Sequence, residues 1–169
     1  TKNEFSYLNL VSQLKERKVN RHYLAIVVGE PLSGSTINEP IGRHPKLRTK
    51  QAVTDAGKEA ITSFSIKERM GGYTLLNVSL ETGRTHQIRV HLAFINFPIL
   101  GDSVYGGRKK FAAGTTEAVK KEILKFPRQA LHAEKLEFIH PQSGKKVNYS
   151  AKTPKDLLQL IELLKNLNE

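Results

Sequence analysis

Strand-like and helical patterns are mixed along this 169-residue sequence without a regular strand–helix–strand alternation, which predicts a single α+β domain. Residues 74–80 alternate between apolar and polar side chains, the period of a half-buried strand. Residues 85–96 carry apolar side chains at helical spacing and stop before Pro98. The last residues combine Thr153 as an expected N-cap with Pro154 at the first helical position, which predicts a C-terminal helix.

The remaining elements follow from the same periodicities, taken in chain order. The first half should contain an amphipathic helix, a buried strand, a long loop or irregular hairpin, and a pair of strands hinged at two glycines. In residue numbers these are 5–14, 23–28, 33–50, 60–66 and 74–80. The second half should add a short helix and two strands joined by a tight turn. These are residues 119–124, 129–138 and 145–151.

The composition favours a polyanionic partner. The chain has 27 Lys+Arg against 16 Asp+Glu, a net charge of +11, so its surface should attract nucleic acid, although a merely solvated basic surface is the alternative. The absence of cysteine excludes disulfides, thiol nucleophiles and cysteine-based zinc sites. No run approaches the length of a membrane span, so we expect a cytoplasmic protein without a membrane partner.

The densest group of polar residues is 81–91, which joins a predicted strand to a predicted helix through Gly83. Arg84 and Arg89 could each bind a phosphate or a carboxylate through two parallel hydrogen bonds, although Arg89 could equally be a surface cation. His86 and His91 are five positions apart, which does not match the i,i+4 spacing of a helical zinc site. We therefore expect no metal.

The sequence resembles the large-subunit ribosomal RNA pseudouridine synthases of the RluA/RluD type, and is most similar to the D type. The resemblance rests on segments that occur in family order along nearly the whole chain. They are residues 21–25, 39–45, 81–91, 101–107, 128–133 and 140–144. It implies a pseudouridine synthase fold, a mixed and largely antiparallel sheet flanked by helices, and an enzyme that isomerises uridine to pseudouridine without any cofactor.

The resemblance also implies three catalytic positions. Tyr23 would lie against the uracil and assist proton removal at C5, Arg89 would pair with the catalytic aspartate, and Leu131 would pack beside the base. A flipped base regains part of its lost stacking energy against an aromatic ring. From the residues alone, Tyr23 and Leu131 could both be ordinary core side chains.

One departure from the family pattern concerns the catalytic aspartate itself. In the family it belongs to an H-R-L-D segment before the tyrosine strand, and these 169 residues contain no such segment. Asp55, Asp102 and Asp156 are poor substitutes. We therefore expect residues 1–169 to be a catalytic domain that lacks its N-terminal part and is inactive alone. Arg89, without its partner, should then face an open cleft that Tyr23 also lines.

Two basic segments should grip the RNA backbone together with side chains of the 81–91 segment. The expected RNA-binding residues are Arg43, His44, Lys46, Arg48, Arg84, His86, Arg108 and Lys109. The expected partner is 23S ribosomal RNA or the large ribosomal subunit, bound by a monomer. A non-catalytic RNA-binding or ribosome-assembly module is the alternative function.

Overall fold

A computed structural model describes residues 3–106 and 110–168, which form an α+β domain around one antiparallel sheet. The six strands lie in the order β2-β5-β6-β1-β7-β8. Their bounds are β1 Asn20–Val28, β2 Ser35–Asn38, β5 Ile61–Met70, β6 Tyr73–Leu80, β7 Leu131–Ile139 and β8 Lys146–Ser150. Every pairing among these strands is antiparallel. A separate hairpin consists of β3 Ile41–Arg43 and β4 Gln51–Val53.

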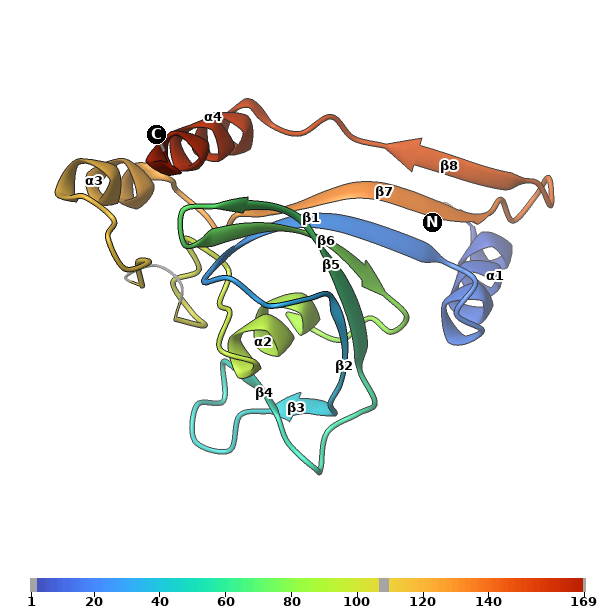
Figure 1. The fold of residues 1–169 in the computed structure, drawn as a ribbon. Coiled ribbons are helices and arrows are strands. Elements are labelled where there is room, and N and C mark those ends of the chain that lie inside the picture. Colours follow the sequence, from blue (N-terminus) through green and yellow to red (C-terminus); the bar gives the residue numbers. More distant parts are fainter. Residues whose placement is uncertain (1–2, 107–109, 169) are drawn as a thin grey trace.

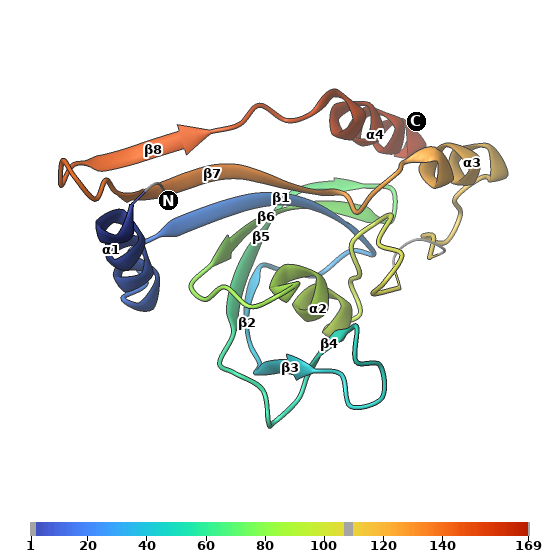
Figure 2. The same cartoon turned by 180° about the vertical axis from the view of Figure 1, so that it is seen from behind.

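The helices cover both faces of the sheet. They are α1 Glu4–Lys15, α2 Gln87–Phe94, α3 Glu117–Lys125 and α4 Lys155–Lys165, followed by a short 3-10 turn over Asn166–Asn168. Helix α2 and the β3–β4 hairpin lie below the sheet, whereas α3 and α4 lie above it at the edge away from α1 (Figure 1, Figure 2). No helix in the described ranges is long and apolar enough to cross a membrane.

The core is built around the central strands β1 and β6. The run from Leu24 to Val28 is buried on both faces, because α2 packs on one side and α4 on the other. Helix α4 contributes Leu157, Leu160 and Leu164, which recur at helical spacing and are all buried. The central position of β1 makes its residues the fixed frame against which the other elements are placed.

The α+β prediction and the order of elements are confirmed, with three corrections. The segment 33–50 contains two short strands, β2 and β3, in addition to a loop. Helix α4 has Pro154, not Thr153, at its N-cap, since Pro154 keeps an extended ψ of 148° and the helix begins at the next residue. Helix α1 forms as predicted, but its apolar residues Phe5 and Leu8 remain exposed, and its buried residue is Gln13.

Candidate functional site

The turn between β6 and α2 is organised by the buried side chain of Gln87. Its Oε1 accepts hydrogen bonds from the Thr82 hydroxyl and the Arg84 backbone N–H, both at 2.9 Å. Its Nε2 donates to the Ile61 carbonyl and the Thr62 hydroxyl, both at 3.0 Å. All the hydrogen-bonding capacity of the amide is therefore used to tie the turn to strand β5.

His86 precedes the helix in the left-handed backbone region, with φ of 58°, and its side chain makes no cap hydrogen bond. Its Nδ1 lies 3.0 Å from the Tyr105 hydroxyl. Partial burial lowers the pKa of His86, and the positive charge of Arg89 lowers it further, although Asp102 acts in the opposite direction. A neutral ring could contact RNA by hydrogen bonding but adds no positive charge near neutral pH.

Arg89 lies on α2 and forms a two-pronged ion pair with Asp102. Its Nε donates to Oδ2 at 2.7 Å and its Nη2 donates to Oδ1 at 2.8 Å. The Asp102 side chain is completely buried, whereas 12% of the Arg89 side chain is exposed. The expectation that Arg89 would face an open cleft without a partner is therefore wrong. Sequence reasoning missed this pair because it depends on a fold-dependent contact between the helix and the following loop.

The electrostatics of the pair are consistent with this geometry. The hydrogen bond from Arg89 to Asp102 raises the pKa of the guanidinium, against the effect of burial. For Asp102, burial acts to raise the pKa, but the hydrogen bonds from Arg89 and from the backbone N–H groups of Tyr105 and Val104 lower it overall. The pair is therefore ionised over the whole physiological pH range.

Tyr23 lies on the same face of the sheet as α2. Directly opposite residues of an antiparallel pair share a face; Tyr23 is opposite Val78, which is opposite Phe64. Thr62, two positions before Phe64, touches α2 through Gln87. Tyr23 and the helix that carries Arg89 therefore lie on one face of the sheet, and that the two residues act together stays a prediction.

Leu131 lies beside Tyr23. Leu131 is paired with Ala25 of β1, and Ala25 is two positions after Tyr23 on that strand. Residues two apart on a strand project from the same face, so Leu131 and Tyr23 share a face. The register between β1 and β7 shifts between His22 and Tyr23, an irregularity of the kind that re-aims side chains near functional sites. Tyr23 also lines an open groove of about 310 Å³. That groove is bordered by Arg21 and by residues of β7 and β8, chiefly Ala133, Leu136 and Tyr149.

Arg21 is a further candidate that sequence reasoning did not single out. It borders the Tyr23 groove and a second groove of about 400 Å³ beside the 81–84 turn. Its Nε is buried without a hydrogen-bond partner in the described chain, and its Nη2 makes only long contacts to the carbonyls of Leu80 and Glu81, at 3.5 and 3.3 Å. Burial lowers its pKa. A half-buried arginine with spare donors is available to an anionic group.

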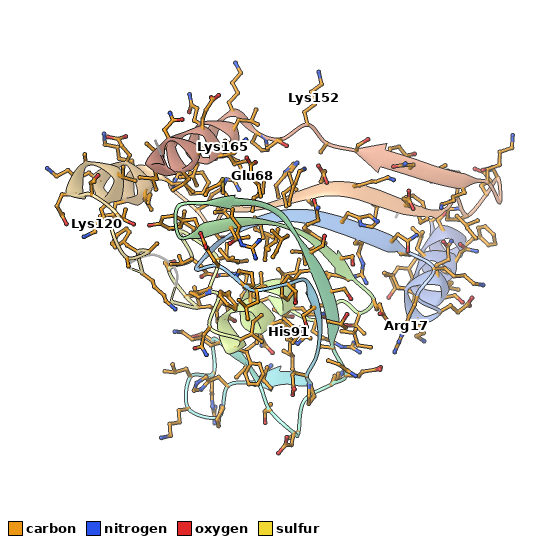
Figure 3. The ribbon with its side chains drawn as sticks, in the orientation of Figure 1. Arg17, Glu68, His91, Lys120, Lys152 and Lys165 are labelled. Carbon is orange, nitrogen blue, oxygen red and sulfur yellow. The ribbon has the colours of Figure 1, made fainter. Side chains whose placement is uncertain are left out.

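The second histidine of the motif, His91, is a structural residue. It is fully buried between α2 and the sheet (Figure 3), with Nε2 2.9 Å from the Glu39 carbonyl and Nδ1 2.8 Å from the Thr62 hydroxyl. A carbonyl only accepts, so Nε2 carries the proton. Across residues 3–106 and 110–168, no group of three or more His, Asp or Glu side chains is arranged to hold a metal ion.

The predicted RNA-binding residues occupy two places. Arg43 at the end of β3, and Lys46 and Arg48 on the loop between β3 and β4, are exposed below the sheet. His44 is only half-exposed, and its Nδ1 accepts the backbone N–H groups of Lys46 and Leu47, so the ring shapes the loop.

The other predicted residues are in or near the 81–91 segment. Arg84 is exposed, with its Nε bonded to the Glu59 carbonyl at 2.9 Å. Arg108 and Lys109 lie outside the described residues. The structure therefore brings Arg84 and His86 to the α2 turn and leaves the β3–β4 loop as a separate basic surface.

Within the described chain the other two aspartates form no ion pair with Arg89 and no hydrogen bond to Tyr23. Asp156 pairs with Arg128 through both oxygens, at 3.0 Å each, where α4 begins. Asp55 is exposed in the turn after β4. Asp102 is adjacent to Arg89, but its carboxylate is fully buried and both oxygens are occupied. That none of the three is the nucleophile stays a prediction.

Comparisons with known proteins identify the family of this chain. A family model described as RNA pseudouridylate synthase matches residues 1–94. The chain is 51% identical over 156 residues to ribosomal large subunit pseudouridine synthase D of Xanthomonas campestris, covering 92% of this chain and 47% of that protein. It is 46% identical to the protein of the same name from Pseudomonas aeruginosa, covering 97% of this chain and 51% of that protein. It is also 46% identical to the protein of the same name from Escherichia coli K12, covering 92% of this chain and 48% of that protein. The chain thus spans about half the length of these relatives.

Two solved human structures share the fold. RNA pseudouridylate synthase domain containing 1 superposes with a TM-score of 0.72 at 25% identity, over 96% of this chain and 65% of that one. RNA pseudouridylate synthase domain containing 4 gives 0.74 at 22% identity, over 96% and 69%. The ordered motifs, the antiparallel sheet with α2 on one face, and these matches lead to one conclusion: the chain belongs to the RNA pseudouridylate synthase family.

Proposed function

We propose that the protein containing this chain isomerises uridines of large-subunit ribosomal RNA to pseudouridine. The observation that carries the proposal is the common placement of Tyr23, Leu131 and the Arg89 helix on one face of the sheet, next to a groove. The printed names of the relatives supply the class of substrate. Such a protein works on ribosomal RNA as a cytoplasmic monomer.

The reaction breaks the N1–C1′ bond and forms a C5–C1′ bond; the C5 proton leaves and N1 finally carries one. Tyr23 lies against the flipped uracil, where its hydroxyl assists removal of the C5 proton, and Leu131 supplies an apolar wall. A positioned acid or base contributes about 10²–10⁴ to the rate. Arg89 stabilises the carboxylate that starts the reaction, because a neighbouring guanidinium keeps a carboxylate ionised and oriented.

That carboxylate is not supplied by these 169 residues. Asp55 is exposed in a turn, and Asp102 and Asp156 are each held by an arginine. We therefore propose that the 169 residues alone form no pseudouridine, whereas the product of the full reading frame does. Turnover by the purified 169-residue chain would contradict this assignment.

The decisive experiment measures tritium release from 23S rRNA transcribed with [5-³H]uridine. The full-reading-frame product should release tritium, and Tyr23→Phe should lower the rate about 10²-fold or more. Tyr7→Phe, on the exposed face of α1, is the matched control and should retain the wild-type rate. RNA binding without tritium release would instead favour the non-catalytic RNA-binding module.

RNA binding should depend on the β3–β4 loop. Changing Arg43, Lys46 and Arg48 to Ala should flatten the plot of log affinity against log salt by roughly 0.7–0.9 for each phosphate that the loop no longer neutralises. A matched control with the same reduction in charge replaces three exposed lysines near α3 and α4 by Ala. These are Lys121, Lys152 and Lys155. Equal slopes in the two triple variants would remove the loop from the RNA interface.

A further inference from the structure

Asp102 holds Arg89 by one edge only. The carboxylate accepts hydrogen bonds from Nε and Nη2 of the guanidinium. No hydrogen bond joins the remaining Nη1 to a described residue, and 12% of the Arg89 side chain is exposed. Since a guanidinium has five N–H donors in a rigid plane, fixing one edge also fixes the direction in which the other edge points. Arg89 therefore presents a second, oriented set of donors.

The carboxylate of Asp102 is itself rigidly held. Its Oδ1 also accepts the backbone N–H groups of Val104 at 2.9 Å and Tyr105 at 3.0 Å. The chain just before it is bonded to the central strand, where the Leu100 N–H donates to the Ile26 carbonyl at 2.8 Å. Gly101 joins the two with φ of +78°, a conformation that favours glycine. Asp102 thus connects Arg89 to β1, the strand that carries Tyr23.

Tyr105 fixes the plane of the guanidinium and links it to the basic loop. Its ring centroid lies 4.9 Å from Cζ of Arg89, a cation–π arrangement. Its hydroxyl oxygen accepts the Gln51 N–H at 3.0 Å, and the Lys50 ammonium donates to the Val104 carbonyl at 2.8 Å. The end of the loop proposed to grip RNA is therefore bonded to the residues that hold Arg89.

We propose that Asp102 is a positioning residue for Arg89: it orients the guanidinium so that its Nη1 edge meets the reacting carboxylate, with Tyr105 fixing the plane. The inference rests on the proposed function and deepens it. A purely structural ion pair would need neither an Nη1 edge left unbonded by the described residues nor an attachment to both the Tyr23 strand and the basic loop. The pair instead lies where a change in the orientation of the Arg89 guanidinium would alter its contact with the reacting carboxylate.

The test compares Asp102→Asn with wild type in the full-reading-frame protein, using tritium release normalised to the folded fraction. We expect kcat to fall at least tenfold and KM for rRNA to change less than about twofold, because the Asp102 side chain is fully buried and cannot itself bind the RNA. The control is Glu137→Gln. Glu137 is also a well-covered carboxylate, 13% exposed and paired with Lys135 at 2.7 Å, but it lies on the face of the sheet opposite α2. It should keep the wild-type kcat.

A double-variant cycle separates positioning from stability. If Asp102 acts through Arg89, Asp102→Asn should change kcat less than twofold in an Arg89→Lys background, whereas independent effects would multiply. If Asp102→Asn does not fold, Tyr105→Leu keeps the backbone N–H to Asp102 and removes the ring, and should also lower kcat. An unchanged kcat in the soluble variants, or multiplying effects, overturns the inference. A wild-type protein that releases no tritium overturns the proposed function as well, which distinguishes the two failures.

Discussion

His91 offers a direct test of how α2 is attached to the sheet. Its side chain is fully buried, and it supplies the hydrogen-bond donor, at 2.9 Å, for the Glu39 carbonyl. His91→Ala removes a ring from a packed site and leaves that carbonyl unpaired. An unpaired buried group costs about 1–3 kcal/mol, and large-to-small changes in a core cost about 2–5 kcal/mol. These two costs cannot simply be added, because the loss of one side chain causes both. We therefore expect the free energy of unfolding to fall by about 3–5 kcal/mol in total.

Thermal unfolding converts this change into an observable. For a domain of this size each kcal/mol lowers Tm by roughly 2–4 °C, so His91→Ala should lower Tm by roughly 6–20 °C. His91→Phe keeps most of the volume and should lose mainly the polar part, about 1–3 kcal/mol. His22→Ala is the control, since the His22 side chain is half-exposed and makes no hydrogen bond within the described chain, and its cost should be smaller.

The same residue predicts a pH dependence. Burial lowers the pKa of His91 below its ordinary value, against the smaller opposing effect of Glu39. Above about pH 6.5 the ring is neutral in both folded and unfolded chains; below it, the unfolded chain binds a proton that the folded chain resists. Stability should therefore fall with decreasing pH, by at most about 1.4 kcal/mol per pH unit from this group, and His91→Phe should lack that component. Parallel stability curves for wild type and His91→Phe between pH 8 and 5 would refute the reasoning.

Three further substitutions test separate parts of the frame, each by its urea unfolding midpoint. Gly101→Ala should lower the free energy of unfolding by about 1–3 kcal/mol, because the φ of Gly101 is +78° and a Cβ there would meet the carbonyl of Arg128. Gly144→Ala is the control: Gly144 also has a positive φ, but a Cβ there would meet open space, so the cost should be smaller. Gln87→Leu should lose about 2–4 kcal/mol by leaving the Thr82 hydroxyl and the Arg84 N–H without their acceptor. Leu157→Ala should lose about 2–5 kcal/mol, because this side chain of α4 is fully buried; a loss below 1 kcal/mol would mean that α4 is not part of the core.

Local patterns in the sequence were enough to predict the elements. The alternation around Val78, the helical spacing of Ile88 and Leu92, and the turn at Gly71-Gly72 each describe the conformation of a few neighbouring residues, and strands and a helix form there. Helix α1 marks the limit of such patterns. Its stripe predicted a helix, but whether Phe5 and Leu8 are buried depends on what packs against them, and within the described chain they remain exposed.

The motif itself could be recognised from the sequence, but the way its residues are divided between roles could not. Within one turn of α2, Gln87 and His91 are buried structural groups, whereas Arg89 points to the loop at Asp102. Neighbouring helical residues point in directions about 100° apart, so only the position of the helix on the sheet decides which of them faces the core.

The sequence by itself determined the α+β class, the basic surface and the family, because these depend on composition, periodicity and ordered motifs. Only the tertiary structure decided that Tyr23 shares a face with α2 and that Arg89 is held by Asp102. The physical reason is that both facts depend on strand register and loop closure, which bring together residues distant in sequence. A one-residue shift of register would turn Tyr23 to the opposite face without changing any local pattern.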